Sequence, residues 1–369
     1  MKYYIIAGEA SGDLHGSNLI KELKKLDDAA DIRCWGGDLM QHAGAHLVKH
    51  YRDLAFMGFI EVAKNLGTIL KNLKFCKEDI LQFKPDALIL IDYPGFNLRI
   101  AKWAKQQGLK VIYYISPQVW AWKENRVKQM KKDIDKMIII IPFEKEYFKD
   151  KWSWDVEYVG HPLAAEIENQ KSKIINHKFS EKPIVALLPG SRKQEIAKKL
   201  PIMLEASKFF PGHQFIVAEA PSVEDEFYIN FTKSYSNVSA VKNQTYNLLS
   251  QAQAAAVTSG TATLETALFG VPEVVCYKGS PISYQIAKRV IKVKYISLVN
   301  LIMDKLVVKE LIQNELTVDN LKHVLHELIT NKERINEIKK DYAELRALLS
   351  EGGNASAKAA KSIVQFLSQ

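Results

Sequence analysis

The sequence predicts an α/β fold with two doubly wound, Rossmann-like domains, on two observations. Short all-apolar runs alternate along the chain with amphipathic stretches of helical spacing, such as 17–26 and 96–107. Runs that are apolar on both faces suit strands buried in a parallel sheet. A chain of 369 residues also fits two domains of roughly 150–200 residues better than one. The expected strands are 3–7, 86–91, 111–115, 137–141, 184–188, 214–218, 254–257 and 273–276.

The division between the domains falls in a polar segment. "VGHPLAAEI" closes the first series of strands and helices, and the lysine-rich "ENQKSKIINHKFSEKP" follows it. A second series begins at Ile184, and from residue 318 onward the pattern is helical only. We therefore assign residues 1–165 to an N-terminal domain and 166–344 to a C-terminal domain.

Composition narrows the class of protein. A hydrophobic content of 47% and a charged content of 25% are typical of soluble globular domains. The net charge of +9 favours an anionic partner, but the chain has no zinc-finger spacing, aromatic-interleaved RNA motif or basic tail, so nucleic acid is disfavoured. The three cysteines are far apart and fit a reducing cytoplasm. No run of 18 apolar residues predicts a membrane span, although the protein can still lie on a membrane.

The stretch "AGEASGDLHG" at 7–16 has the order strand, glycine turn, helix start, as in a nucleotide phosphate loop. Glu9 and Asp13, however, stand where an anion would have to bind. Carboxylates there suit the hydroxyl or amide groups of a sugar, and Gly8 and Gly12 would allow its close approach. The alternative for Asp13 is helix capping. The candidate sugar-binding residues are Glu9, Ser11, Gly12 and Asp13.

Residues 59–75, "FIEVAKNLGTILKNLKF", have apolar side chains at helical spacing and lysines on the other face. One interpretation is a helix that faces the core. The other is an interfacial helix that inserts apolar side chains into lipid and places lysines near anionic head groups. The candidate membrane-associating residues of this stretch are Ile60, Val62, Leu66 and Ile69, together with Met57 just before it.

Asp92 in "ALILIDYPGFN" stands where a buried strand ends. If this carboxylate is partly shielded from water, its pKa rises and it can act as a general base. The alternative is a loop aspartate that caps the next helix.

Further along, Trp120 and Trp122 in "SPQVWAWKENRV" could stack on a sugar or a lipid-linked group, although packing is the default.

In the second half, "IVALLPGSRKQE" gives strand, tight turn and helix. Ser191 is the expected N-cap, with Gln194 completing a capping box. Arg192 would then project at the carboxyl end of a strand, where open α/β sheets bind ligands, and its guanidinium suits a diphosphate. The alternative is an ordinary capped helix with a surface arginine.

"AAAVTSGTATLETALFGVP" is the stronger of the two motifs. A small hydroxyl-rich turn, Ser259, Gly260 and Thr261, opens a helix whose free backbone N–H groups and dipole favour an anion. Glu265 lies one turn further and could accept hydrogen bonds from a ribose diol. The alternatives are plain capping for the turn and a solvated helix glutamate for Glu265.

Taken together, these segments resemble the bacterial lipid-A-disaccharide synthase family over nearly the whole chain. "LLPGSR" and "SGTATLE" alone indicate only sugar-nucleotide glycosyltransferases, whereas "GEASGD" together with "SPQVWAW" is far more specific. The other segments that carry the resemblance are "LAFMGFIEV", "IDYPGFN", "PFEKEYF", "VGHPL" and "YISLVNLI".

The resemblance implies a GT-B architecture, with two domains facing a cleft and C-terminal helices, about 345–369, returning to the N-terminal domain. It implies an inverting transfer of 2,3-diacylglucosamine from UDP to the 6'-hydroxyl of 2,3-diacylglucosamine 1-phosphate, which releases UDP. Asp92 would be the general base. The UDP-binding residues would be Arg192, Ser259, Gly260, Thr261, Glu265 and Asn300.

The resemblance also implies peripheral association with the inner face of the cytoplasmic membrane and a homodimer with exchanged C-terminal segments. No carboxylate cluster suggests a metal, and a diphosphate neutralised by arginine and a helix dipole needs none, so we expect no cofactor. Two alternatives remain open. One is another UDP-N-acetylglucosamine enzyme, either a 2-epimerase or the muramyl-lipid transferase, and the other is a non-catalytic UDP-sugar-binding protein.

Overall fold

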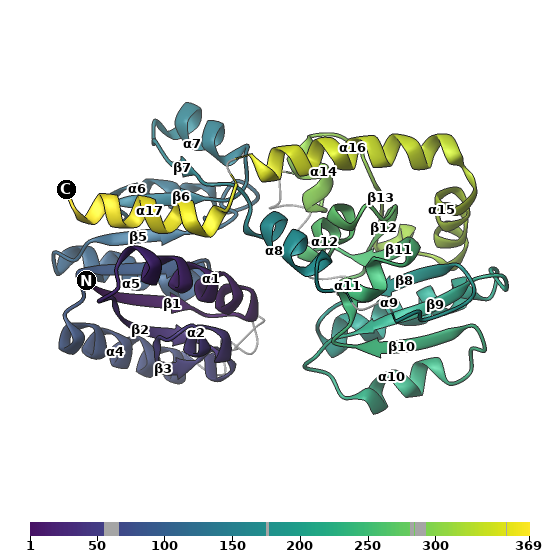
Figure 1. The fold of residues 1–369 in the computed structure, drawn as a ribbon, viewed down its shortest axis with the longest axis horizontal. Coiled ribbons are helices and arrows are strands. Elements are labelled where there is room, and N and C mark those ends of the chain that lie inside the picture. Colours follow the sequence, from purple (N-terminus) through teal and green to yellow (C-terminus); the bar gives the residue numbers. More distant parts are fainter. Residues whose placement is uncertain (55–65, 175–176, 281–283, 285–292, 352) are drawn as a thin grey trace. The chain divides into compact units, whose positions relative to one another are not determined.

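A computed structural model describes residues 1–54, 66–174, 177–280, 284, 293–351 and 353–369. The chain forms two compact units. Unit 1 comprises Met1–Pro162 and Ser350–Gln369, and unit 2 comprises Leu163–Leu349. Each unit contains one parallel sheet flanked by helices, so the predicted pair of doubly wound α/β domains is confirmed (Figure 1).

The sheet of unit 1 has the order β3-β2-β1-β4-β5-β6-β7, with every neighbouring pair parallel. The chain moves outward from β1 to β3 and then returns to β4, so the order reverses between β1 and β4. Ligands of open α/β sheets bind outside the carboxyl ends of the strands at such a reversal. The strands are β1 (Lys2–Ala7), β2 (Asp31–Gly36), β3 (His46–His50), β4 (Ala87–Ile91), β5 (Val111–Tyr114), β6 (Lys136–Ile139) and β7 (Glu157–Tyr158).

The helices of unit 1 cover this sheet. The last of them, α17 (Ala355–Leu367), packs against α1 (Ala10–Leu26), which confirms the expected return of the C-terminal region to the N-terminal domain (Figure 1). Ser362 on α17 donates a 2.5 Å hydrogen bond to Glu157 on β7. The other helices are α2 (Asp38–His42), α4 (Leu66–Phe83), α5 (Pro94–Gln106), α6 (Val127–Asp133) and α7 (Glu144–Trp152), with the 3₁₀ turns η1 (Tyr51–Leu54) and η2 (Glu124–Arg126).

The sheet of unit 2 has the order β10-β9-β8-β11-β12-β13 and is also parallel throughout. Here the order reverses between β8 and β11, so the turns that follow these two strands flank the expected ligand position. The strands are β8 (Ile184–Leu188), β9 (Gln214–Glu219), β10 (Val238–Lys242), β11 (Ala252–Thr258), β12 (Glu273–Tyr277) and β13 (Lys309–Ile312).

The helices of unit 2 connect these strands and then extend beyond the sheet. They are α8 (Pro162–Lys171), α9 (Lys193–Ser207), α10 (Asp225–Thr232), α11 (Thr245–Leu249), α12 (Thr261–Phe269), α14 (Leu298–Met303), η3 (Gln313–Glu315), α15 (Val318–Thr330) and α16 (Lys332–Ser350). Within the described ranges, none of the helices of either unit is both long and apolar enough to cross a membrane.

Candidate functional site

Asp92 lies at the carboxyl end of β4, beside the reversal point of the first sheet. Its φ of 44° and the φ of 48° at Tyr93 are left-handed values that non-glycine residues rarely adopt. Two side chains hold this turn by its backbone: Tyr113 Oη donates to the Asp92 carbonyl at 2.5 Å, and Asn97 Nδ2 donates to it at 2.8 Å. The fold therefore fixes the carboxylate in a strained turn, as is common at functional sites.

The environment of Asp92 suits a general base. Burial and then the charge of Glu9 raise the pKa of the Asp92 carboxyl to about 7, although a hydrogen bond from the Tyr93 backbone opposes the shift. The N-cap of α5 is Tyr93, with no side-chain capping hydrogen bond. Asp92 thus does not cap the next helix, and its pKa lies near that of an effective base at neutral pH.

The N-terminal turn lies at the same edge of the sheet. Glu9 is the N-cap residue of α1, and Ser11 is exposed in the first turn of that helix. A Cβ atom added at Gly8 would overlap the ring of Tyr93, so this turn packs directly on the turn that carries Asp92. The structure therefore brings Glu9 and Asp92 together, as the effect of Glu9 on the Asp92 pKa also indicates.

Gly12 and Asp13 have structural roles instead of the expected sugar-binding ones. A Cβ at Gly12 would lie 3.1 Å from that of Ala7, so this glycine allows α1 to pack closely on β1. The Asp13 carboxylate is only 3% exposed and accepts backbone N–H bonds from Gly37, Leu39 and Met40 at 2.8, 3.1 and 3.0 Å. These bonds cap the start of α2. The capping alternative therefore describes Asp13, although the capped helix is not its own.

A second buried carboxyl group, Glu144, was missed in the sequence. It begins α7 and is 1% exposed; Trp120 Nε1 donates to its Oε1 at 2.9 Å, and Oε2 has no hydrogen-bond partner in the described part of the chain. Burial raises the pKa of Glu144 to about 8, and the charge of Asp92 contributes to the shift. The segments "VWAW" and "PFEKEYF" both stand out in the sequence. The contact between them spans 24 residues, so no local pattern indicates that Trp120 and Glu144 meet.

Replacing Glu144 with glutamine should remove part of the pH dependence of stability. In the folded protein Glu144 stays protonated up to about pH 8, whereas in the unfolded chain it loses its proton near pH 4.5. Raising the pH through this window therefore destabilises the wild type relative to Glu144→Gln, by up to about 1.4 kcal/mol per pH unit. Unfolding followed by tryptophan fluorescence measures this, because all six tryptophans lie in unit 1.

Glu146→Gln, at an exposed position of the same helix, controls for loss of a carboxylate. A stability difference between Glu144→Gln and the wild type that stays constant between about pH 4.5 and pH 8 would contradict the burial of a protonated Glu144.

In unit 2, the turn after β8 carries Arg192. The expected N-cap at Ser191 and the capping box with Gln194 are wrong, because α9 begins at Lys193 and its N-cap is Arg192, without a side-chain capping bond. The Arg192 side chain is 55% exposed and forms a 3.3 Å ion pair with Glu195. Gly190 has a φ of 129°, which only glycine adopts readily. The turn thus presents an accessible guanidinium at the reversal point of the sheet.

The turn after β11 leads into α12 and lies on the other side of the same reversal. Gly260 is the N-cap of α12 with a φ of 146°, and this N-cap residue forms no side-chain capping bond. Ser259 Oγ donates to the Ile296 carbonyl at 2.8 Å, which ties the turn to the segment before α14. Thr261 is exposed in the first turn. The uncapped N–H groups and the helix dipole make this end suitable for an anion.

Lys199 is a buried cation between these two turns, and no sequence pattern distinguishes it. Its side chain is 3% exposed; Nζ donates to Thr258 Oγ1 and lies 4.0 Å from Glu195. Burial lowers the pKa of this lysine, although Glu195 opposes the shift. In the sequence it is one of several lysines on an amphipathic helix, so only its packing distinguishes it.

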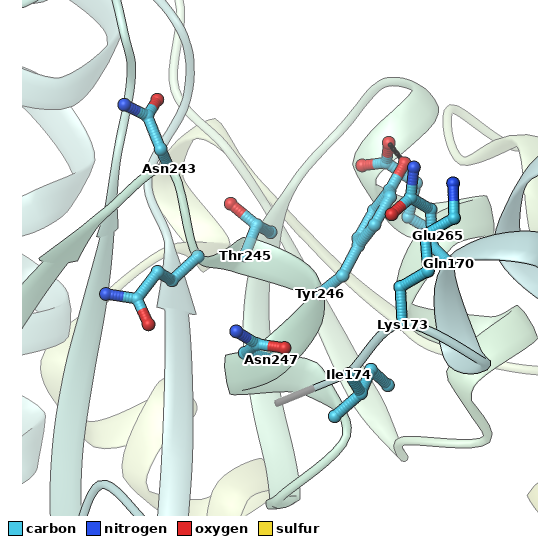
Figure 2. A pocket seen from close by; sticks show the side chains of 9 residues that line it. Gln170, Lys173, Ile174, Asn243, Thr245, Tyr246, Asn247 and Glu265 are labelled. Atoms are coloured by element: carbon cyan, nitrogen blue, oxygen red, sulfur yellow. Dashed lines mark hydrogen bonds between the residues drawn. The ribbon is translucent and has the colours of Figure 1, made fainter. Parts of the chain in front are cut away.

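Glu265 lines a cavity of about 440 Å³ in unit 2. Tyr246 Oη donates to Glu265 Oε1 at 3.0 Å, and Figure 2 shows the two side chains meeting at the cavity. Burial raises the pKa of Glu265, whereas the bond from Tyr246 lowers it. The residues that line the cavity are Gln170, Lys173, Ile174, Asn243, Gln244, Thr245, Tyr246, Asn247 and Glu265.

Asn300 has a structural role and no hydrogen-bonding capacity left for a nucleotide. Its side chain is fully buried. Nδ2 donates to the Val308 carbonyl at 2.8 Å and to Glu310 at 2.9 Å, and Oδ1 accepts from the N–H groups of Val307 and Val308 at 2.9 Å each. Because all four amide positions are occupied, Asn300 fixes the path from α14 to β13 instead of contacting UDP directly.

Of the expected membrane-associating residues, Met57, Ile60 and Val62 lie outside the described residues, and Leu66 begins α4. Ile69 on α4 is partly buried and packs against the core of unit 1. Within the described ranges, no three histidine, cysteine, aspartate or glutamate side chains are close enough to hold a metal ion.

The chain matches the family model for lipid-A-disaccharide synthetase over residues 3–365. The lipid-A-disaccharide synthase of Geobacter metallireducens is 39% identical over 358 residues, which cover 95% of this chain and 93% of the relative. The corresponding protein of Coxiella burnetii is 37% identical over 367 residues, covering 97% and 96%. Lipid-A-disaccharide synthase 1 of Legionella pneumophila is 40% identical, covering 84% and 83%.

Solved structures share the fold at much lower sequence identity. UDP-GlcNAc 2-epimerase from Neisseria meningitidis, bound to UDP-GlcNAc, has a TM-score of 0.68 at 14% identity, covering 99% of this chain and 100% of the epimerase. The calicheamicin glycosyltransferase CalG4 has a TM-score of 0.67 at 15% identity, covering 100% and 98%. These likenesses support the GT-B fold class. From the family model and the curated relatives, we conclude that the chain belongs to the lipid-A-disaccharide synthase family of glycosyltransferases.

Proposed function

We propose that this protein transfers 2,3-diacylglucosamine from UDP to the 6'-hydroxyl of 2,3-diacylglucosamine 1-phosphate, with inversion at the anomeric carbon. The observation that carries the proposal is Asp92, a rigidly held carboxyl group with a pKa of about 7 at the reversal point of the first sheet. An inverting transfer is a single displacement and needs one such base. Family membership supplies the substrate class.

In the proposed reaction, Asp92 takes the proton of the acceptor hydroxyl as its oxygen attacks the anomeric carbon of the donor. The bond from that carbon to the diphosphate oxygen breaks, and UDP leaves with the bonding electrons. Negative charge therefore grows on the diphosphate, where Arg192 and the start of α12 would stabilise it. Glu9 lies close enough to Asp92 for its charge to raise the pKa of that carboxyl, and Glu9 together with Ser11 would orient the acceptor sugar.

For the donor, we propose that Arg192, Ser259, Gly260 and Thr261 hold the diphosphate and that Glu265 holds the ribose. The cavity beside Glu265 supports this assignment, because it offers amide and hydroxyl groups next to the carboxylate. Solved neighbours include proteins described as bound to UDP-GlcNAc or UDP. Arginine and helix-dipole charges would neutralise the diphosphate, so the proposed reaction uses no metal or other cofactor.

An assay with labelled UDP-2,3-diacylglucosamine and its 1-phosphate acceptor tests the function. We expect a disaccharide 1-phosphate and one UDP for each bond formed. Conversion of UDP-N-acetylglucosamine to its 2-epimer in place of disaccharide would favour the epimerase. Tight UDP binding without turnover of any of these substrates would favour a non-catalytic binding protein.

We further propose that the protein is cytoplasmic and associates peripherally with the inner face of the cytoplasmic membrane. We also propose a homodimer that exchanges C-terminal segments, in which α17 of each chain would take the place that α17 of the other chain has here. Flotation with anionic liposomes tests the association. We expect Ile60→Glu combined with Leu66→Glu to reduce flotation, because charged side chains oppose insertion into lipid.

The matched control is Ile229→Glu combined with Leu306→Glu, which alters two exposed apolar residues of unit 2. Unchanged flotation of the first variant, or an equal loss in the control, would show that residues 59–75 do not form the membrane contact.

A further inference from the structure

The segment between β5 and α6 holds two cations against one exposed aromatic ring. Trp122 is 42% exposed. Lys123 Nζ lies 4.2 Å from the centroid of its ring, and the guanidinium carbon of Arg126 lies 5.9 Å from the same centroid. Cation–π contacts of this kind hold a charged side chain in place without neutralising its charge.

Neither cation is neutralised by a carboxylate of the described residues. Throughout the described residues, no carboxylate lies within ion-pair distance of Lys123 or Arg126. Glu124 lies between them in sequence but accepts hydrogen bonds from Lys151 at 2.6 Å and Tyr147 at 2.9 Å. Burial and the charge of Arg126 lower the pKa of Lys123, as expected for like charges held close together. A bound anion would relieve this repulsion.

The cation pair lies near Asp92. Tyr113 Oη donates to the Asp92 carbonyl at 2.5 Å, and Arg126 is close enough for its charge to act on that hydroxyl. The backbone conformation also indicates a functional site here. The loops that follow β4 and β5 hold four non-glycine residues in the left-handed region, and strained backbone concentrates at functional sites. These residues are Asp92, Tyr93, Ile115 and Lys123.

We propose that Lys123 and Arg126, held by Trp122, bind the phosphate of the acceptor sugar. The inference rests on the proposed function, in which the acceptor carries its reactive hydroxyl and its phosphate on one sugar ring. A hydroxyl at Asp92 therefore places the phosphate within one ring's length of that carboxylate. A phosphomonoester carries about −1.5 to −2 charges at neutral pH and accepts paired hydrogen bonds from a guanidinium. A lipid head group offers the same chemistry, so the test must separate the two sources.

The test compares the acceptor with the same acylated sugar lacking the phosphate, using wild type and the double variant Lys123→Gln with Arg126→Gln. We expect the wild type to prefer the phosphorylated acceptor. The variant should lose at least about tenfold in kcat/KM for that acceptor, because hydrogen bonds to charged groups disappear. Its activity toward the acceptor without phosphate and its KM for the donor should be unchanged.

The matched control, Lys132→Gln with Lys149→Gln, removes two exposed lysines of unit 1 and should leave the preference intact. If the wild type is active and the Lys123 and Arg126 variant keeps its preference, the phosphate site is wrong and the proposed function stands. An equal loss in the control also overturns the site. If the wild type makes no disaccharide from either acceptor, the proposed function fails and the phosphate site fails with it.

Flotation with phosphatidylglycerol vesicles identifies the other source of phosphate. We expect the Lys123 and Arg126 variant to float as the wild type does. A variant that loses flotation but keeps its preference for the phosphorylated acceptor would assign these cations to the membrane surface and overturn the proposal.

Discussion

Replacing Asp92 with asparagine is expected to lower the rate of disaccharide formation by about 10²–10⁴-fold, the usual contribution of a general base. Asparagine tolerates the left-handed backbone at this position and keeps the side chain nearly isosteric, but it cannot take the proton. In the wild type, kcat/KM for the acceptor should fall about tenfold per pH unit below the Asp92 pKa of about 7 and level off above it. Initial rates measured from acid to neutral pH test both statements.

The matched control is Asp53→Asn, which alters an exposed carboxylate of unit 1 whose ion pair with Lys49 spans 3.6 Å. It should leave the pH profile unchanged. Full activity in Asp92→Asn, or a variant that keeps the acidic fall in rate, would remove Asp92 from the role of base.

Replacing Arg192 with alanine is expected to have the second large effect on disaccharide formation. Charge grows on the leaving diphosphate as the glycosidic bond breaks, so we expect kcat to fall by about 10²–10³-fold, with a higher KM for the UDP donor. Arg192→Lys should be intermediate, since an ammonium keeps the charge but lacks the paired donors of a guanidinium. Steady-state kinetics with varied donor at saturating acceptor measures both parameters.

Lys193→Ala offers a control at the next position of the chain. It removes a positive charge at the start of α9 that pairs with Glu224. A loss in Lys193→Ala as large as that in Arg192→Ala would indicate a general effect of charge near this turn. Donor kinetics that do not change in Arg192→Ala would place the diphosphate elsewhere.

The strands that the sequence predicted are those buried on both faces. β4 and β8 are apolar at every position and fully buried, so composition alone identifies them. The missed strands have mixed composition for physical reasons. β3, β10 and β13 are edge strands that carry polar residues, and β7 has only two residues. β2 is an interior strand, but Asp31 and Arg33 interrupt its apolar pattern. Their positions depend on pairing with neighbouring strands, which periodicity does not report.

The candidate site residues also fall into those whose role the sequence predicts and those whose role it does not. Asp92 and Arg192 could be selected because each follows a strand directly, and the ends of parallel strands meet at one edge of a sheet. Asp13 could not be assigned correctly, because the N–H groups it binds lie 24 to 27 residues away. The family resemblance implies a ligand contact for Asn300, but hydrogen bonds to Val307, Val308 and Glu310 occupy its whole amide. A sequence motif indicates that a polar residue matters, but its bonding partners decide what it does.

The packing of α17 against α1 also sets an order of assembly during protein synthesis. The residues that complete unit 1, Ser350–Gln369, leave the ribosome only after all of unit 2. Unit 2 is continuous and can fold first, whereas α1 lacks its partner α17 until the end of synthesis. The buried residues of α17 include Ala359, Ala360 and Ile363. A nascent chain interrupted near residue 350 would therefore carry an incomplete unit 1, the unit that holds Asp92, although the interruption lies far from Asp92 in sequence.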